Sequence, residues 1–146
     1  MRKQYFPFFV LLLFLADRIS KQAVLRFLPE GHSIPVIDGI FHLTRVDNAG
    51  AAFGLFRGAL PFLVAVTVVS VIFLFFFLSA SREGVSSPQY WGWTLVMGGA
   101  LGNLYDRLTY HYVIDFLDVR VWPVFNVADS FVCVGVFLVF LSAFRK

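Results

Sequence analysis

Two aspartates, Asp115 and Asp129, are the side chains whose surroundings best suit catalysis, because both lie in apolar stretches of the sequence. Two carboxyl groups that meet in a poorly hydrated site cannot both ionise, so they would share one proton. The ionised group can then take a proton from an attacking water, while the protonated group supports the oxygen of a peptide carbonyl. This pair therefore indicates acid–base hydrolysis of the kind that aspartic proteases perform.

Further polar residues occur at spacings that place them on one face of a helix. Asp17 and Lys21 are four positions apart with the acid first, the favourable order for an ion pair, and Asn103 and Arg107 repeat the spacing. Asn126 lies three positions before the second aspartate, which predicts that both project from one face. Ionisable groups within a spanning helix cost roughly 2.5 to 3.5 kcal/mol each, so they indicate function. For the first pair, a satisfied ion pair at the membrane interface is the simpler alternative.

Other chemistries fit the sequence less well. No two of the three histidines have the four-residue spacing of a zinc site on a helix, and we expect neither a metal nor another cofactor. A serine and lysine dyad would need Lys21 with Ser20, which points elsewhere on the helix, or with the distant Ser130. A proton-coupled transporter would also use intramembrane acids, but no internal repeats accompany them here. A purely structural membrane protein is the remaining alternative.

The composition excludes a water-soluble globule, so membrane-spanning helices must position these residues. Of the 146 residues, 59% are hydrophobic and only 14% are charged. The mean hydropathy is +0.79, and the 19 phenylalanines exceed what so small a core could hide from water. The net charge of +3 is small and scattered, so we expect no nucleic-acid partner. Cys133 is the only cysteine, which excludes an intramolecular disulfide.

The uncharged stretches predict an all-α membrane protein with four transmembrane helices in a single membrane domain, residues 1–146. One uncharged stretch is long enough to cross a bilayer by itself. The other three are too short, so each predicted span must include polar residues at one end. The first is expected to be retained, because Phe14 stands where a signal peptide would need a small residue before cleavage at Ala16. The four spans are expected at about residues 5–25, 59–80, 90–107 and 125–144.

The polar ends of the first, third and fourth spans fall on one face of the membrane, together with the connecting segments 28–57 and 109–124. The basic residues do not decide the orientation by themselves, and they place the termini in the cytoplasm only weakly. Within the first segment, branched and aromatic runs at 33–37 and 40–46 flank Asp38-Gly39, the dipeptide of a type I′ turn. A small β-hairpin should therefore lie over the helices.

Small residues are gathered in two places where backbones can approach closely. Residues 51–54 follow the turn cluster at 47–50, and Gly98, Gly99 and Gly102 lie on the third span. The span glycines form a small-xxx-small pattern that permits close helix contact.

The chain resembles the bacterial lipoprotein signal peptidases, the signal peptidase II family, over nearly its whole length. Five blocks carry the resemblance in order: DRISK at 17–21, NAGAAFG at 48–54, GGALGNLYDR at 98–107, VIDF at 113–116 and FNVADS at 125–130. Any one of these blocks alone would be a weak signal. Their number and order make the resemblance specific.

The resemblance implies a four-helix enzyme of the bacterial inner membrane, with its termini in the cytoplasm and its active site near the periplasmic face. A small periplasmic β-hairpin or cradle would cover the site, and a loop or short helix at 109–124 would act as a lid. Such enzymes cleave prolipoproteins before a cysteine that already carries diacylglycerol, so the implied partners are these substrates and membrane lipid. We expect the chain to act as a monomer.

By position in the family blocks, Asp115 and Asp129 would be the catalytic pair. The residues that would bind substrate or support the pair are Asp17, Lys21, Asn48, Gly50, Gly99, Asn103, Arg107 and Asn126. Arg18 departs from the family pattern, in which a glutamine is usual, and helical spacing predicts that it faces away from its acidic neighbour with little effect on the chemistry. The resemblance also suggests that the glycines of the third span leave room for a lipid-modified substrate.

Overall fold

A computed structural model describes residues 5–50, 55–80 and 87–144. The helices are α1 (Phe6–Phe27), α2 (Leu60–Ala80), α3 (Ser87–Thr109) and α4 (Val127–Ala143). The strands are β1 (Ser33–Ile37), β2 (Phe41–Asn48) and β3 (Val113–Asp118). The small residues at 51–54 that the sequence singles out lie outside the described residues.

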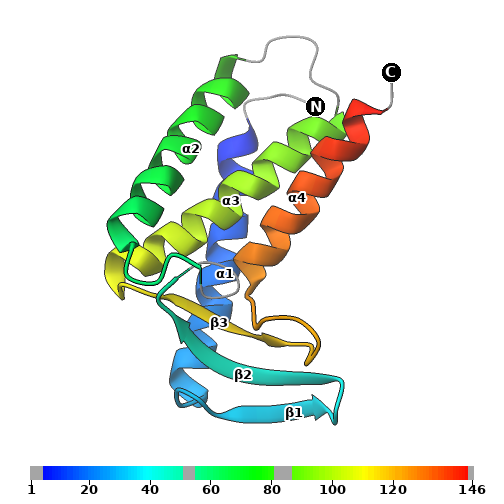
Figure 1. The fold of residues 1–146 in the computed structure, drawn as a ribbon. Helices are drawn as coiled ribbons and strands as arrows, with labels where there is room; N and C mark the ends of the chain where they lie inside the picture. The colour runs from blue at the N-terminus through cyan, green and yellow to red at the C-terminus, as the bar shows by residue number, and fades with distance from the viewer. Residues whose placement is uncertain (1–4, 51–54, 81–86, 145–146) are drawn as a thin grey trace.

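The four helices lie side by side, and the sheet closes one end of them (Figure 1). The central helix is α3, which packs against each of the other three. α1 begins and α4 ends at the far end from the sheet (Figure 1). The described part of the chain is therefore mostly helical, with a small antiparallel sheet.

The helix α2 carries an almost wholly apolar surface that the rest of the molecule leaves uncovered. Only Leu74 and Leu78 of this helix are buried, while side chains such as Phe73 and Phe76 are exposed. Among the described helices, α2 alone is both long and apolar enough to cross a membrane, and the apolar helix α4 is shorter. An exposed apolar surface of this size is typical of contact with lipid.

The predicted hairpin is confirmed, although its turn differs from the expected type. β1 pairs with β2 in antiparallel register, Ser33 facing Thr44. Three residues connect the strands, and Gly39 is the one with a positive φ, at 69°. A type I′ turn would need positive φ at two residues, so the bulged pairing near Ile37 replaces the predicted two-residue turn.

Only the later part of the segment at 109–124 is the expected loop, because Val113–Asp118 form β3, and the loop after it lines the cavity at Val119 and Trp122. This strand pairs with β2 and lies between the hairpin and the helices (Figure 1). Ile114 and Phe116 are buried and pack against Val24 and Leu28 near the end of α1. Alternating side chains of a strand point to opposite faces, so β3 is anchored on the bundle and does not have the form of a lid.

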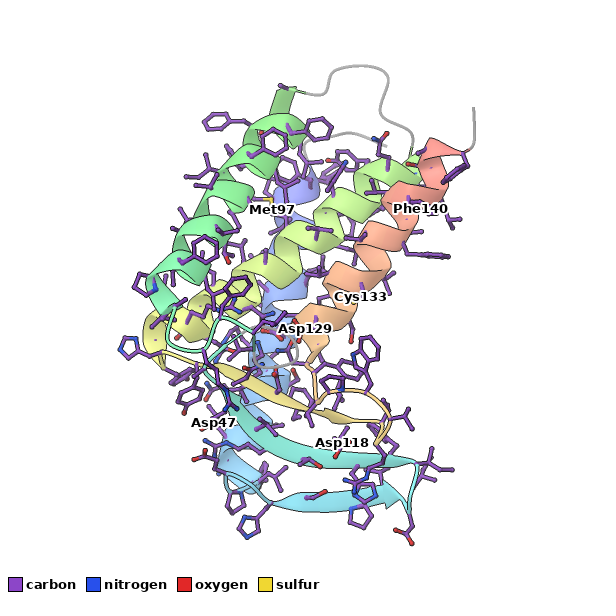
Figure 2. The ribbon with its side chains drawn as sticks, in the orientation of Figure 1. Asp47, Met97, Asp118, Asp129, Cys133 and Phe140 are labelled. Carbon is purple, nitrogen blue, oxygen red and sulfur yellow. The ribbon has the colours of Figure 1, made fainter. Side chains whose placement is uncertain are left out.

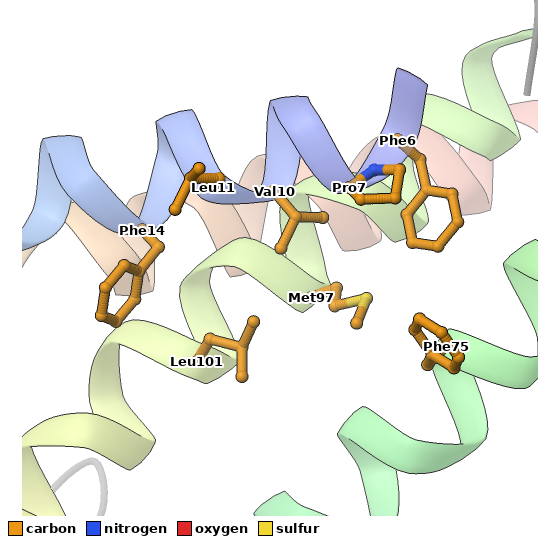
Figure 3. A pocket seen from close by; sticks show the side chains of 8 residues that line it. All are labelled: Phe6, Pro7, Val10, Leu11, Phe14, Phe75, Met97 and Leu101. Carbon is orange, nitrogen blue, oxygen red and sulfur yellow. The ribbon is translucent and has the colours of Figure 1, made fainter. Parts of the chain in front are cut away.

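A second apolar cluster holds the opposite end of the bundle together, where Phe6 and Val10 of α1 meet Leu78 and Met97. Beside this cluster lies an apolar hollow of about 300 Å³ between α1, α2 and α3 (Figure 3). Its lining residues are Phe6, Pro7, Val10, Leu11, Phe14, Phe75, Met97 and Leu101. The hollow has no polar side chain that could do chemistry.

Candidate active site

The polar helix ends that the sequence predicts to share one face do meet, at the junction between the helices and the sheet. Figure 2 shows Asp129 at this junction, at the sheet end of α4, and Phe140 toward the other end of the same helix. Asp115 enters from β3, Asn103 from α3 and Lys21 from α1. Residues more than a hundred positions apart thus surround one site.

The residue Asn126 holds both aspartates. Its Nδ2 donates to Asp115 Oδ1 at 2.7 Å, and its backbone N–H donates to Asp129 Oδ2 at 3.3 Å. In return, Asn126 Oδ1 accepts a hydrogen bond from the backbone N–H of Asp129 at 2.8 Å, which completes a capping box at the start of α4. The two carboxyl groups are therefore fixed around one fully buried asparagine.

Each carboxyl group also accepts a hydrogen bond from a second asparagine. Asn48 Nδ2 donates to Asp115 Oδ2 at 2.9 Å, and Asn103 Nδ2 donates to Asp129 Oδ1 at 2.7 Å. Both aspartates nevertheless face a cavity of about 1020 Å³. The pair is thus held by amides on one side and open to a reactant on the other.

The pKa of Asp115 is raised from 3.8 to about 7, first by burial and then by the charge of Asp129, while the hydrogen bonds from Asn48 and Asn126 act in the opposite direction. A neutral carboxyl group close to an ionised one is the arrangement that a shared proton requires.

The cavity is built from both halves of the molecule. Besides Gly50, its lining includes the polar residues Asn48, Arg57, Asn103, Arg107, Asp115, Asp129 and Ser130. Arg107 Nη2 donates to the backbone oxygen of Gly50 at 3.4 Å, which ties α3 to the segment after β2. The cavity continues along α4 past Val132, Cys133 and Val134, so part of its wall is apolar.

The comparisons with known proteins agree with one another. A family model described as signal peptidase (SPase) II matches residues 9–145. The chain belongs to the signal peptidase II family. It is thus a member of a family of peptidases, enzymes that hydrolyse peptide bonds.

Named relatives cover almost the whole chain. A lipoprotein signal peptidase of Halothermothrix orenii is 43% identical over 94% of this chain and 93% of its own length. One from Pelotomaculum thermopropionicum is 44% identical over 88% of this chain and 84% of its own. Such coverage leaves no large part of this chain without a counterpart.

Two solved structures share the fold. A bacterial membrane enzyme determined by the in meso method at 2.3 Å resolution matches with a TM-score of 0.88 and 27% identity, over 97% of this chain and 88% of that chain. A second bacterial membrane enzyme, at 1.9 Å, matches with a TM-score of 0.85 and 27% identity, over 98% of this chain and 94% of that chain. The likeness supports a membrane protein with this arrangement of helices and sheet.

The DRISK block of α1 lies behind the cavity and not in its wall. Asp17 and Lys21 are both fully buried, and Lys21 Nζ lies 2.9 Å from Asp17 Oδ2. The same Nζ donates to Asn103 Oδ1 at 2.9 Å, and Asp17 Oδ1 accepts from the backbone N–H of Ala128 at 3.0 Å. This pair therefore contacts the residues that hold the aspartates.

The glycines of α3 do not leave room for a substrate, contrary to the expectation from the sequence. A Cβ on Gly99 would collide with the backbone oxygen of Ala128 in α4, and one on Gly98 would collide with Leu13 in α1. A Cβ on Gly102 would collide with the carboxylate of Asp17. The glycines permit close helix packing instead, and the cavity lies along α4.

The serine and lysine alternative lacks the required contact. Ser130 Oγ donates to the backbone oxygen of Asn126, and Ser20 Oγ donates to that of Asp17. The described histidines, cysteine and acids form no cluster of three that could hold a metal ion.

Sequence reasoning missed two charged residues that the structure brings beside this network. Asp106 is fully buried and contacts Lys21, and Arg18 forms an ion pair with Asp106. Asp106 stood within a recognised block of the sequence, and its four-residue spacing from Gly102 and seven-residue spacing from Gly99 would have placed it on the packed face of α3.

Proposed function

We propose that this member of the signal peptidase II family is an intramembrane aspartic endopeptidase that removes signal peptides from diacylglyceryl-modified prolipoproteins, cleaving before the lipidated cysteine. Asp115 and Asp129 are the catalytic pair in this proposal. The observation that carries it is the single buried residue Asn126, whose side chain donates to the Asp115 carboxyl group and whose backbone N–H donates to the Asp129 carboxyl group, while both aspartates line the cavity.

The chemistry follows from a pair that shares one proton. The ionised aspartate takes a proton from a water molecule, whose oxygen attacks the carbonyl carbon of the scissile peptide bond. The protonated aspartate donates to the carbonyl oxygen, and a proton then passes to the amine as the C–N bond breaks. The raised pKa of Asp115 supports a proton on the pair near neutral pH.

The supporting residues act on the geometry of this pair. Asn48, Asn103 and Asn126 orient the carboxyl groups by the hydrogen bonds described above. Asp17 and Lys21 hold Asn103 and the start of α4 from behind. The contact of Arg107 with Gly50 fixes the rim of the cavity, and Gly99 lets α3 and α4 approach closely enough to bring their residues together.

The membrane arrangement belongs to the same proposal. The four helices cross the bacterial inner membrane in a single domain, with spans at about residues 5–25, 59–80, 90–107 and 125–144 and periplasmic segments at 28–57 and 109–124. The exposed apolar surface of α2 and the gathering of polar groups at one end of the bundle support it. A lipidated substrate would reach the aspartates along the apolar wall of α4, since the cavity extends there.

The decisive experiment is cleavage of a diacylglyceryl-modified prolipoprotein by the purified enzyme. Asp115→Asn and Asp129→Asn should each reduce cleavage by at least about a thousandfold, because each removes one of the two carboxyl groups that exchange protons with water and substrate. The unlipidated substrate should be cleaved far more slowly by the wild-type enzyme.

Asp118→Asn is the matched control, since Asp118 lies on β3 with Asp115 but contacts Thr44 and Arg120 and not the cavity. Substantial cleavage by either catalytic variant contradicts the aspartate pair. Loss of wild-type cleavage on addition of EDTA would favour a metal mechanism instead.

A further inference from the structure

Arg18 lies in the interior of the molecule, although its position on α1 predicts a side chain with little bearing on the site. It is 8% exposed. Its guanidinium pairs with the carboxylate of Asp106 on α3, and its Cζ lies 4.3 Å from the centre of the Tyr105 ring. Stacking on an aromatic face together with a carboxylate contact is a combination to which the planar guanidinium is suited.

The partner of Arg18 holds the strand that carries a proposed catalytic residue. Asp106 Oδ2 accepts a hydrogen bond from the backbone N–H of Ile114 at 3.2 Å. Ile114 is fully buried and directly precedes Asp115. A shift of this carboxylate would therefore move the backbone from which Asp115 projects.

A second route from the same carboxylate leads to the other aspartate. Lys21 Nζ lies 2.8 Å from Asp106 Oδ2 and also donates to Asn103 Oδ1. Asn103 in turn donates to Asp129. Lys21 lies between the carboxylates of Asp17 and Asp106. Its position therefore affects the orientation of Asn103 and, through it, of Asp129.

Arg18 balances the charge of this buried cluster. Asp17 and Asp106 are two carboxylates with no exposed surface, and Lys21 alone would leave one negative charge without compensation. A buried carboxylate that loses its cation either takes up a proton or competes for the remaining one. Protonation would weaken the hold of Asp106 on Ile114. Competition for the remaining cation would draw Lys21 away from Asn103.

We propose that Arg18 is a positioning residue for the peptidase reaction, which pairs with Asp106 and holds its carboxylate in place so that Asp115 and Asp129 stay aligned. The inference rests on the proposed function of these two aspartates. Arg18 does not line the cavity, so it acts without touching the substrate.

The test compares Arg18→Gln and Arg18→Lys with wild type in the cleavage of a diacylglyceryl-modified prolipoprotein peptide. Arg18→Gln should lower kcat about tenfold and leave KM within about twofold, because alignment and not substrate binding is lost. Arg18→Lys should recover part of the loss, to about threefold below wild type, since an ammonium keeps the charge but not the fork or the stacking. Arg26→Gln removes a charge from an exposed position of the same helix and should match wild type.

A double-mutant cycle with Asp106→Asn shows whether the effect passes through that carboxylate. In the Asp106→Asn background, Arg18→Gln should cause little further loss of kcat. An unchanged kcat in Arg18→Gln, or an equal loss in both backgrounds, overturns the proposal. If Asp106→Asn is inactive, the partial rescue by Arg18→Lys decides, and a lysine variant no better than the glutamine variant contradicts it.

If Arg18→Gln does not accumulate, Arg18→Lys decides alone. A kcat near one third of wild type at constant KM supports the positioning role, and a wild-type kcat refutes it. Asp129→Asn in the same assay separates this inference from its premise. If the Asp129→Asn enzyme is active, the proposed function itself is contradicted. If it is inactive and the Arg18→Gln enzyme is fully active, only the role of Arg18 is contradicted.

Discussion

At the scale of single residues, the candidate site depends on asparagines that make carboxyl groups tolerable in a buried place. Asp115 is 3% exposed, yet both of its oxygens accept an amide N–H. Buried polar groups are costly unless they are hydrogen-bonded, so Asn48 and Asn126 offset part of that cost. The remaining cost appears as the raised pKa of Asp115.

The raised pKa predicts how cleavage depends on pH. The value of about 7 in the folded protein lies above the ordinary 3.8, so Asp115 keeps its proton through weakly acidic pH and loses it as pH rises through about 7. Because the proposed mechanism needs one proton on the pair, kcat should fall as the pH rises above about 7. A kcat that stays constant from about pH 6 to about pH 9 would contradict this assignment.

The same shift has a consequence for stability, with a fixed sign. The folded state binds the Asp115 proton more tightly than the unfolded state, so this group lowers the stability of the folded protein as pH rises from about 4 to about 7. Above that range its contribution is constant.

At the scale of the elements, the contact between α3 and α4 brings the polar residues together. Gly99 meets the backbone of Ala128, and Gly92 meets that of Gly135 two turns away. Asn103 lies one turn beyond Gly99, and Asp129 directly follows Ala128, so the spacing of the two helices determines whether their side chains reach one another. Close packing at the glycines is therefore a condition for the site.

Gly99→Ala should separate these helices and weaken the enzyme. The new Cβ collides with backbone, which cannot swing aside as a side chain can, so the free energy of unfolding should fall by about 1–3 kcal/mol. Thermal unfolding of the purified protein in detergent measures the change, and kcat should fall with it.

Leu108→Ala, an exposed position on the same helix, serves as the control. Equal stability of the Gly99→Ala variant and wild type would mean that the α3–α4 contact is looser than described.

At the scale of the whole molecule, the buried polar network of the described residues lies at one end of the bundle, and exposed apolar side chains cover much of the helices. The sheet lies at one end, and the end of α4 lies at the other (Figure 1). The two aspartates belong to the sheet end, since Asp115 is in β3 and Asp129 is in the first turn of α4. Exposed phenylalanines such as Phe73, Phe76 and Phe137 lie along the helices between these ends. This division is what a bilayer with water on both sides favours.

Cysteine labelling tests the proposed membrane arrangement. In a Cys133→Ala background, Asp38→Cys in the hairpin turn should react with a membrane-impermeant maleimide in right-side-out vesicles. Phe144→Cys at the end of α4 should react in inside-out vesicles. Both positions are exposed, and removal of Cys133 is needed because that side chain is exposed as well. Labelling of both cysteines from the same side of the membrane would contradict the proposed arrangement.

Much of the fold followed from local patterns in the sequence. Apolar runs, three of them extended over polar residues at one end, predicted the bounds of the four helices to within a few residues, and the branched runs around Asp38-Gly39 predicted the hairpin. These features depend on periodicity and on turn preferences, which neighbouring residues determine among themselves. The motif blocks likewise identified the family, which the comparisons confirm.

The features that the sequence left undecided all depend on contacts between distant segments. The strand β3 exists because β2 lies beside it, and nothing in its own six residues excludes a loop. From the sequence alone, the glycines of α3 could make room either for a substrate or for a neighbouring helix. The structure shows that Ala128 and Leu13 occupy the space beside them. Arg18 faces away from Asp17 along α1, but α3 supplies an acid on that side.

The sequence by itself thus determined where the helices and the hairpin form, which acids are present and which family the chain resembles, because short-range patterns specify these. Only the tertiary structure decided which polar groups share a site and which small residues serve packing, because burial and partners are properties of the assembled bundle and not of any segment.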